Sequence, residues 1–421
     1  MNLETKCLHA GYQPENGGPG VMPIVQSTTY RFDSTAKIAS LFDMPMECIY
    51  SRFANPTCDA VEKKIAELEG GVGAMLTSSG QAASLLSILN VCSAGDSFIA
   101  ATTIYGGTIN LFGVTLKKLG IECIWADAEA SEEEIQKLFK PNTKAVFGET
   151  LANPALAVFD IEKWAAIAHK NHVPLIIDST FATPILCRPF EWGADIVIHS
   201  TTKYMDGHAV QGGGVIVDSG KFDWAASGKF PDFTEPDESY HGVVYTREFG
   251  NMAYIIKARM QLMRDFGCYP AAHSAFLLNL GLETLPVRMA QYCRNAETVA
   301  KHLAGSDKIA GVRYPGLPGD KYYELGKKYL PQGTSGVMSI DIKGGREAAM
   351  KFMDSLKLAC NEVHVADIRT CVLHPASETH RQLTDEQLVA AGIEPGLVRL
   401  SVGLENVEDI IADLDQALAQ I

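Results

Sequence analysis

Residues 70–95 read GGVGAMLTSSGQAASLLSILNVCSAG, and this uncharged stretch decides the fold. It is long enough for a membrane span, but it holds ten Gly and Ser residues together with Thr77, Gln81 and Asn90. A helix facing lipid would not carry so many small and polar residues. We interpret the stretch as a buried strand, a glycine turn and a buried helix, and we expect no membrane partner.

The chain on both sides of this stretch repeats the same pattern. A helix precedes it, because Asn55 is a good N-cap, Pro56 suits the first helical position and Gly70 ends the periodicity. From within this stretch to about residue 220, short apolar runs alternate with helical patterns; the runs cover 74–76, 97–100, 122–125, 145–147, 174–177, 195–198 and 214–217. Runs that are apolar on both faces predict an α/β fold with a mainly parallel sheet.

The remaining sequence suggests three regions. Repeated Gly and Pro break any periodicity in residues 1–56, which we expect to form an extended N-terminal arm that lies on another surface. The α/β alternation predicts a domain at 57–256. Residues 257–421 show long helical patterns first and strands later, which predicts a C-terminal α+β domain.

Composition excludes several classes of function. The 421 residues are enough for roughly two or three domains. There are 36 basic and 50 acidic residues, a net charge of −14, and no basic cluster, so we expect no nucleic-acid partner. The ten cysteines lie at least ten positions apart, which excludes a CxxC metal or redox pair and suits a reducing cytoplasm. The N-terminus has no apolar signal-peptide region, so we expect a cytoplasmic protein. Because no CxxC pair is present, we also expect no metal.

Polar residues follow three of the predicted strands. Residues 77–82 form a Gly/Ser turn that opens a helix, Asp178 follows one apolar run, and Ser200, Thr202 and Lys203 follow another. Taken singly, these are a geometric turn, a helix cap and a solvated lysine. Parallel strands end at one edge of a sheet, so together they place phosphate donors, an acid and an amine in one site. Pyridoxal 5′-phosphate (PLP) needs all three.

From Cys7-Leu8-His9-Ala10-Gly11 to the C-terminal helix, the chain resembles the Cys/Met-metabolism family of PLP enzymes. The resemblance implies fold-type I, with a mainly parallel cofactor-binding sheet and a C-terminal α+β domain. It also implies that Lys203, in Ser200-Thr201-Thr202-Lys203-Tyr204, bonds covalently to PLP and acts in catalysis. Asp178 would hold a proton on the ring nitrogen.

The same resemblance assigns further cofactor contacts. Tyr105 would stack on the ring and take part in catalysis, and Asn153 would bond the ring hydroxyl. The phosphate would be bound by Ser79, Gly80, Gln81, Ser200 and Thr202.

Tyr50 and Arg52, in Tyr50-Ser51-Arg52-Phe53, match a segment that reaches the cofactor phosphate of a neighbouring subunit. Without the resemblance, Arg52 is more simply a surface ion pair. The resemblance leads us to expect a homo-oligomer, namely a tetramer built as a dimer of dimers with shared active sites.

Arg399 is a charge with apolar neighbours in a predicted strand, which demands an anionic partner. An internal Asp or Glu is one possibility. The resemblance favours the α-carboxylate of an amino-acid substrate, bound by the guanidinium fork.

Within the family, the loop at 228–245 and the segment 399–409 resemble the O-acetylhomoserine sulfhydrylase branch. Methionine γ-lyases carry a cysteine at the position of Gly107. His364 stands about where many lyases have a serine. We therefore expect γ-replacement on O-acetyl-L-homoserine by sulfide; methanethiol and sulfur carried on a protein stay open as donors. The alternatives are a methionine or cystathionine γ-lyase and a cystathionine γ-synthase.

Two rivals from other classes fit the sequence less well. A nucleotide-binding oxidoreductase would carry a GxGxxG turn after a strand with an acid about 20 residues further on, and the sequence lacks this pattern. A non-catalytic protein on the same scaffold would have no need to retain Lys203, Asp178, Tyr105 and Arg399 together.

Overall fold

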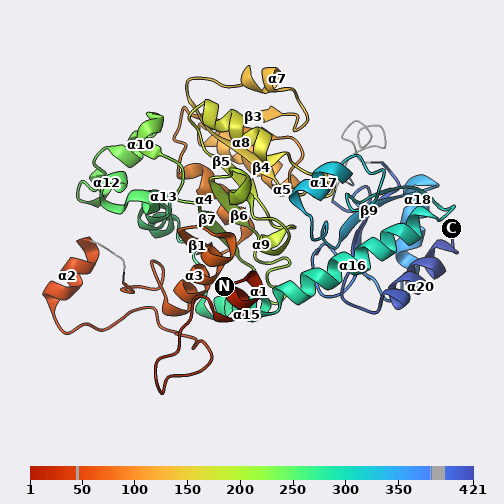
Figure 1. Cartoon of the computed structure of the whole chain (residues 1–421), viewed down its shortest axis with the longest axis horizontal. Helices are drawn as coiled ribbons and strands as arrows, with labels where there is room; N and C mark the ends of the chain where they lie inside the picture. Colours follow the sequence, from red (N-terminus) through yellow and green to blue (C-terminus); the bar gives the residue numbers. More distant parts are fainter. Residues whose placement is uncertain (44–46, 380, 382–393) are drawn as a thin grey trace. The chain divides into compact units, whose positions relative to one another are not determined.

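The computed structural model describes residues 1–43, 47–379, 381 and 394–421 (Figure 1). The chain divides into two compact units. Unit 1 holds residues 1–150, 159–206 and 210–283, and unit 2 holds 151–158, 207–209 and 284–421. Two short segments of unit 2 are therefore drawn from the middle of the sequence.

Unit 1 is built around a seven-stranded sheet. Its strand order is β1-β7-β6-β5-β4-β2-β3, and of these seven strands β7 alone runs in the opposite direction to the others. The strands are β1 (Gly73–Thr77), β2 (Ser97–Ala101), β3 (Glu122–Ala126), β4 (Thr143–Glu149), β5 (Leu175–Asp178), β6 (Ile196–His199) and β7 (Gly214–Asp218). The prediction of a mainly parallel sheet is confirmed.

The central strands need helices on both faces. Every residue of β2, β6 and β7 is buried, so successive side chains on both sides of the sheet are covered. The longer helices of unit 1 are α3 (Pro56–Glu69), α4 (Gly80–Leu89), α8 (Ile161–Lys170) and α15 (Ala272–Glu283). The predicted ends of α3 are confirmed: the Asn55 side chain accepts from Thr57 N, and Gly70 ends the helix with φ 79°. The stretch 70–95 is β1, a turn and α4.

Shorter helical segments complete unit 1. They are α5 (Gly106–Asn110), η1 (Leu111–Thr115), α6 (Leu116–Lys118), α7 (Glu132–Gln136), α9 (Thr183–Leu186), η2 (Pro189–Trp192), α10 (Trp224–Ser227), α11 (Pro231–Thr234), η3 (Glu238–Tyr240), α12 (Tyr245–Phe249), η4 (Gly250–Met252), α13 (Ala253–Lys257), η5 (Ala258–Met263) and α14 (Arg264–Phe266). The segment 228–245, expected as a loop, thus carries α11 and η3.

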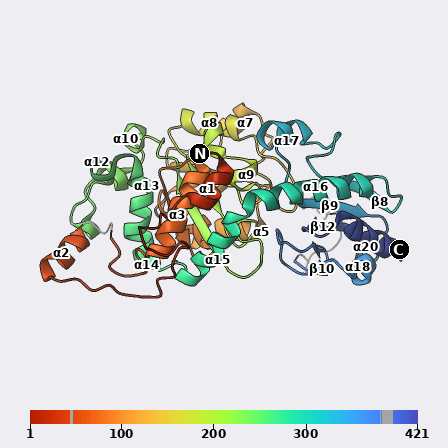
Figure 2. The same cartoon turned by 60° about the horizontal axis from the view of Figure 1, so that its bottom comes forward.

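The N-terminal arm differs from its expected extended form. It contains two helices, α1 (Leu3–His9) and α2 (Thr35–Asp43). Figures 1 and 2 show α1 beside α3 and α15, with which it packs. The buried side chain of Cys7 lies on this helix. Tertiary burial therefore stabilises a helix that is too short to form alone.

Unit 2 holds a five-stranded sheet in the order β10-β11-β12-β9-β8. Helices α16, α18 and α20 share one apolar core with its strands, so they cover one face of the sheet (Figure 1). The elements are α16 (Leu285–Ala304), β8 (Ile309–Arg313), α17 (Tyr323–Tyr329), β9 (Val337–Ile342), α18 (Gly345–Ser355), β10 (Cys360–Asn361), β11 (Cys371–Leu373), β12 (Leu397–Ser401) and α20 (Val407–Leu418).

The change of unit near the C-terminal region falls between Glu283 and Thr284, and not at 256 and 257. Residue 257 ends α13, which packs on β1 and β7, and α15 packs on α3. These helices belong to unit 1 through tertiary contacts that a change in local pattern does not reveal. None of the helices in the described ranges is both long and apolar enough to cross a membrane.

Candidate active site

The turn between β1 and α4 is built to bind an anion. Ser79 is the N-cap of α4, and its hydroxyl accepts from Ala82 N at 3.1 Å. The first N–H groups of a helix have no acceptor within the helix, and the helix dipole favours negative charge there. Gly80 lies against Ser200: a Cβ added at Gly80 would be 2.6 Å from the Ser200 Cβ. The two predicted phosphate-binding segments are therefore in contact.

A threonine links the acid of β5 to the lysine segment. The Thr180 hydroxyl donates to Asp178 Oδ1 at 2.6 Å and accepts from Ser200 N at 2.8 Å. Thr180 N also donates to Asp178 Oδ1, at 3.0 Å. Burial raises the pKa of the Asp178 carboxyl, whereas the Thr180 hydrogen bonds and the nearby His199 lower it. Asp178 stays partly accessible at the end of its strand, so its carboxylate is able to meet a ligand.

Lys203 lies in the turn that follows β6. Its backbone N donates to Ser200 O at 3.3 Å, and its side chain is partly buried. The neighbouring Thr202 hydroxyl accepts from Gly213 N at 3.0 Å and donates to Gly213 O at 3.2 Å. Thr202 thus ties the lysine turn to the chain just before β7. This backbone contact holds the lysine segment in place from a second side.

Tyr105 begins helix α5 and is held through its backbone. Tyr105 N donates to the buried carboxylate of Glu149 at 2.7 Å. Glu149 ends β4 and is paired with Asp178 in the sheet register, so both acids lie at the same edge. A Cβ added at Gly107 would be 2.5 Å from the Tyr105 ring and 3.1 Å from the Gln81 amide nitrogen. The ring therefore lies close to the start of α4.

These residues of unit 1 fit the groups of PLP. An acid, a helix N-terminus and the turn that carries Ser200, Thr202 and Lys203 meet at the carboxyl edge of one sheet, and an aromatic ring lies near the helix N-terminus. The acid suits the pyridine nitrogen, the amine the aldehyde, and the N–H groups of Gly80 and Gln81 the phosphate. Sequence-predicted residues Ser79, Gly80, Gln81, Tyr105, Asp178, Ser200, Thr202 and Lys203 all lie in this arrangement.

In unit 2, the buried Arg399 joins two other segments. Its Nη1 donates to the Asn153 side-chain oxygen at 3.4 Å, and its Nη2 donates to the His364 carbonyl at 2.7 Å. Asn153 precedes Pro154 through a cis peptide bond. The neighbours of Arg399 that these bonds identify are neutral oxygens. They orient the guanidinium, whose fork geometry suits a carboxylate ligand.

The arm residues Tyr50 and Arg52 lie together in unit 1. The Arg52 guanidinium is 5.4 Å from the Tyr50 ring centroid and 5.1 Å from that of Phe53, and it donates to the Arg264 carbonyl. Tyr50 is 37% exposed. Their expected role toward a neighbouring subunit stays a prediction.

Sequence reasoning missed three contributors to the site. Thr180 forms an Asx turn with Asp178, and the Asp-x-Thr spacing was the available signal. Glu149, at the end of an apolar run, carried the same signal as Asp178. The third is a buried pair: His199 Nε2 lies 2.6 Å from Glu69 Oε1, and the two positions are 130 residues apart in sequence.

The chain is similar to known proteins over nearly its whole length. The family model of the Cys/Met metabolism PLP-dependent enzymes matches residues 4–419. The chain is 44% identical to an O-acetyl-L-homoserine sulfhydrylase of Leptospira meyeri, over 99% of this chain and 97% of that protein. It is 42% identical to a homocysteine/cysteine synthase of Kluyveromyces lactis, over 100% and 98%.

A solved structure is similar throughout its length. It is a putative O-acetylhomoserine (thiol)-lyase of Campylobacter jejuni, solved with an N′-pyridoxyl-lysine-5′-monophosphate residue. The TM-score is 0.95 at 37% identity, and all of both chains is covered. With the matching family model and these full-length relatives, the chain belongs to the Cys/Met metabolism PLP-dependent enzyme family.

Proposed function

We propose that this protein is a PLP-dependent O-acetyl-L-homoserine sulfhydrylase. It would replace the acetoxy group at Cγ with sulfide, giving L-homocysteine and acetate for methionine biosynthesis. The observation that carries the proposal is that the turn carrying Lys203, the Asp178–Thr180 pair and the start of α4 meet at one sheet edge. The names of the full-length relatives support this choice of reaction within the family.

PLP, when bound, supplies an electron sink for the bond from the substrate Cα to its proton. Lys203 Nζ would take that proton and return a proton to the chain of the substrate. Asp178, as a carboxylate, would hold the proton on the ring nitrogen, and Thr180 would hold Asp178. The Tyr105 ring would cover the cofactor, and Tyr105 would assist the proton transfers.

Arg399 would bind the substrate α-carboxylate. Its guanidinium is oriented by Asn153 and His364, so little rotamer freedom is left to lose when the substrate binds. The bound carboxylate would hold the substrate in one orientation. Binding at this end leaves Cγ free to lose acetate and to accept sulfide.

Product analysis tests the proposal. Purified protein with PLP, O-acetyl-L-homoserine and sulfide should yield homocysteine and acetate in equal amounts. L-Methionine or cystathionine alone should yield little 2-oxobutyrate. Abundant 2-oxobutyrate from methionine, with no homocysteine from the first mixture, would instead identify a γ-lyase. Homocysteine replaced by cystathionine when cysteine is supplied would identify a γ-synthase.

One relative's name adds a second candidate reaction. The Kluyveromyces lactis protein is a homocysteine/cysteine synthase. The same assay with O-acetyl-L-serine therefore tests for replacement at Cβ, with cysteine as the product. Methanethiol in place of sulfide tests the identity of the sulfur donor.

We also propose that the protein works in the cytoplasm as a homotetramer, a dimer of dimers in which Tyr50 and Arg52 reach the phosphate of the neighbouring subunit. Light scattering on the purified holoenzyme measures the oligomeric state. A monomer with full activity would contradict shared sites.

A further inference from the structure

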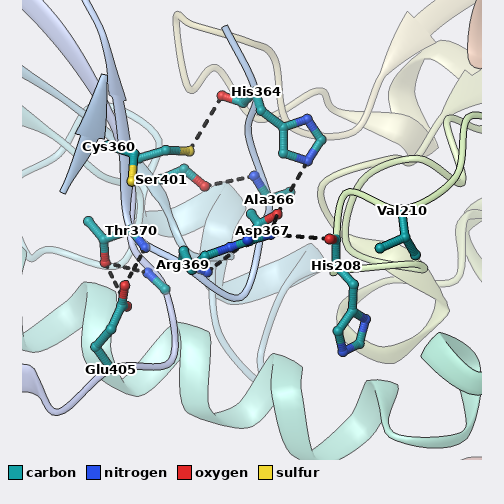
Figure 3. A network of polar contacts seen from close by, with 12 residues as sticks. His208, Val210, Cys360, His364, Ala366, Asp367, Arg369, Thr370, Ser401 and Glu405 are labelled. Atoms are coloured by element: carbon teal, nitrogen blue, oxygen red, sulfur yellow. Dashed lines mark hydrogen bonds and ion pairs between the residues drawn. The ribbon is translucent and has the colours of Figure 1, made fainter. Parts of the chain in front are cut away.

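The loop at 364–371 in unit 2 is held by hydrogen bonds along its length. Ala366 N donates to Ser401 Oγ at 2.7 Å, and Thr370 N donates to the Glu405 carboxylate at 2.7 Å. The Thr370 hydroxyl donates to the other Glu405 oxygen at 2.9 Å (Figure 3). These three hydrogen bonds hold the short loop in one position relative to the residues that it contacts.

What the loop touches is Arg399. The His364 carbonyl accepts from Arg399 Nη2 at 2.7 Å and from the Cys371 thiol at 3.5 Å. Arg399 and Ser401 are two residues apart in β12, so they share one face of the strand. The loop runs along this face, because Ser401 bonds Ala366 and Arg399 bonds His364. A shift of the loop would therefore move the acceptor that orients the Arg399 guanidinium.

Within this loop, Arg369 binds the fully buried carboxylate of Asp367. Arg369 Nε and Nη2 donate to the two oxygens of Asp367 at 2.7 and 3.0 Å, and Arg369 N adds a third bond at 2.8 Å. Asp367 Oδ2 also lies 3.8 Å from His364 Nε2. A buried carboxylate requires such partners, and the two-bond geometry fixes its orientation.

The same arginine reaches the chain that follows Lys203. Arg369 Nη2 donates to the His208 carbonyl at 3.1 Å, and Ile368 N donates to the Gly207 carbonyl at 2.8 Å. Figure 3 shows the Arg369 side chain between Asp367 and His208. Gly207 and His208 are only four and five residues after Lys203. One side chain thus joins the loop that orients Arg399 to the short segment 207–209 of the same unit.

We propose that Arg369 is a positioning residue for the substrate α-carboxylate: through Asp367 and the His208 carbonyl it fixes the His364 loop, and with it the Arg399 guanidinium. The inference rests on the proposed carboxylate-binding role of Arg399. Arg369 itself is 57% exposed at its side chain and touches neither of the expected cofactor-binding segments in the contacts described. It acts through Arg399.

The test measures binding to the holoenzyme by calorimetry, so it does not depend on turnover. L-Homoserine carries the α-carboxylate, and 3-aminopropan-1-ol is the same molecule without it. Arg369→Met should raise the Kd of L-homoserine by roughly tenfold, since a displaced guanidinium loses its fork geometry. The Kd of 3-aminopropan-1-ol should stay within a factor of about two. Arg369→Lys, which keeps the positive charge and one donor nitrogen, should recover part of the loss.

Two controls separate positioning from general damage. Arg313→Met removes another arginine of unit 2 that pairs with an acid, Asp341 at 3.4 Å, and it should leave both Kd values unchanged. In an Arg399→Met background, Arg369→Met should add almost nothing, because its effect passes through Arg399.

Equal weakening of both ligands, or additive effects in the double variant, would overturn the proposal. So would unchanged L-homoserine binding in Arg369→Met, or wild-type holoenzyme that does not bind L-homoserine. Failure of the proposed function would be seen in the product assay, where the wild type would form no homocysteine. The binding measurements would remain valid in that case.

Discussion

At the scale of single residues, the Thr180 hydroxyl connects two parts of the site that are distant in the sequence. It donates to Asp178 at the end of β5 and accepts from the backbone of Ser200 after β6. Asp178 and the lysine segment therefore share one hydrogen-bonded partner. A change at this side chain should affect both the ring nitrogen and the phosphate ends of the cofactor site.

Thr180→Val keeps the shape of the side chain and removes both hydrogen bonds of the hydroxyl group. The pKa of Asp178 should rise further, because the Thr180 bonds hold it down against burial. We expect affinity for PLP to fall by about 1–3 kcal/mol, the usual cost of leaving polar groups unpaired. Fluorescence titration of the apoenzyme with PLP measures this. Thr180→Ser retains the hydroxyl and should bind nearly as the wild type does; equal affinity of all three proteins would contradict the link.

Gly107→Ala tests how closely Tyr105 is placed. The new Cβ would lie 2.5 Å from the Tyr105 ring, so the ring must move. We expect kcat/KM for O-acetyl-L-homoserine to fall by roughly tenfold, because small misplacements at a reacting centre are costly. Tm should hardly change, since Tyr105 is 48% exposed. The matched control is Gly106→Ala, whose Cβ would meet no atom within 4 Å. A loss of equal size in both variants would show that the ring position is not responsible.

At the scale of elements, β7 contributes a buried acid at its end. Asp218 is 1% exposed, and its Oδ1 accepts from Gly220 N at 2.8 Å. Burial, with the nearby charge of Asp195, raises the pKa of the Asp218 carboxyl to about 7 from an ordinary value of 3.8. Between about pH 4 and pH 7, the folded protein therefore keeps a proton on Asp218 that the unfolded chain has already released. The stability that depends on this proton is fully present below about pH 4 and is lost as the pH rises to about 7.

Asp218→Asn should remove that part of the pH dependence, because the amide is neutral at every pH. Tm of the wild type should fall between pH 5 and pH 8 by more than that of the variant. At pH 8 the variant should be more stable by roughly 1–3 kcal/mol. Differential scanning calorimetry at matched scan rates measures the difference. Asp223→Asn alters an exposed carboxylate of the same unit and should keep the wild-type profile. Parallel profiles for the wild type and Asp218→Asn would refute the role of Asp218.

At the scale of the whole molecule, the proposed sharing of sites gives a complementation test. Lys203→Ala lacks the residue that would bond to the cofactor, and Arg52→Met lacks the one that would reach the neighbouring phosphate. Each alone should be nearly inactive. After the two are dissociated and reassembled together, half of the dimers are mixed and one site in each is intact, so roughly a quarter of wild-type activity should return. Activity that stays at the level of the separate variants would argue for sites completed within one chain.

The sequence by itself determined the elements and the chemistry of the site. Apolar runs separated by helical patterns predicted the sheet of unit 1, and the residues after those runs predicted the acid, the lysine and the helix turn. These features are readable because burial on two faces, N-caps and turns depend on neighbours a few positions away. The resemblance then added roles for Tyr105, Asn153 and Arg399 that no local pattern carries.

Only the tertiary structure decided which of these residues touch. Thr180 joins Asp178 to Ser200, Glu149 holds the backbone of Tyr105, and Arg369 binds the segment after Lys203. It also decided that the arm forms α1 and that unit 1 extends to Glu283. Such contacts join positions tens to hundreds of residues apart. Their partners are chosen by packing against other elements, and so they leave no periodic signal in the sequence.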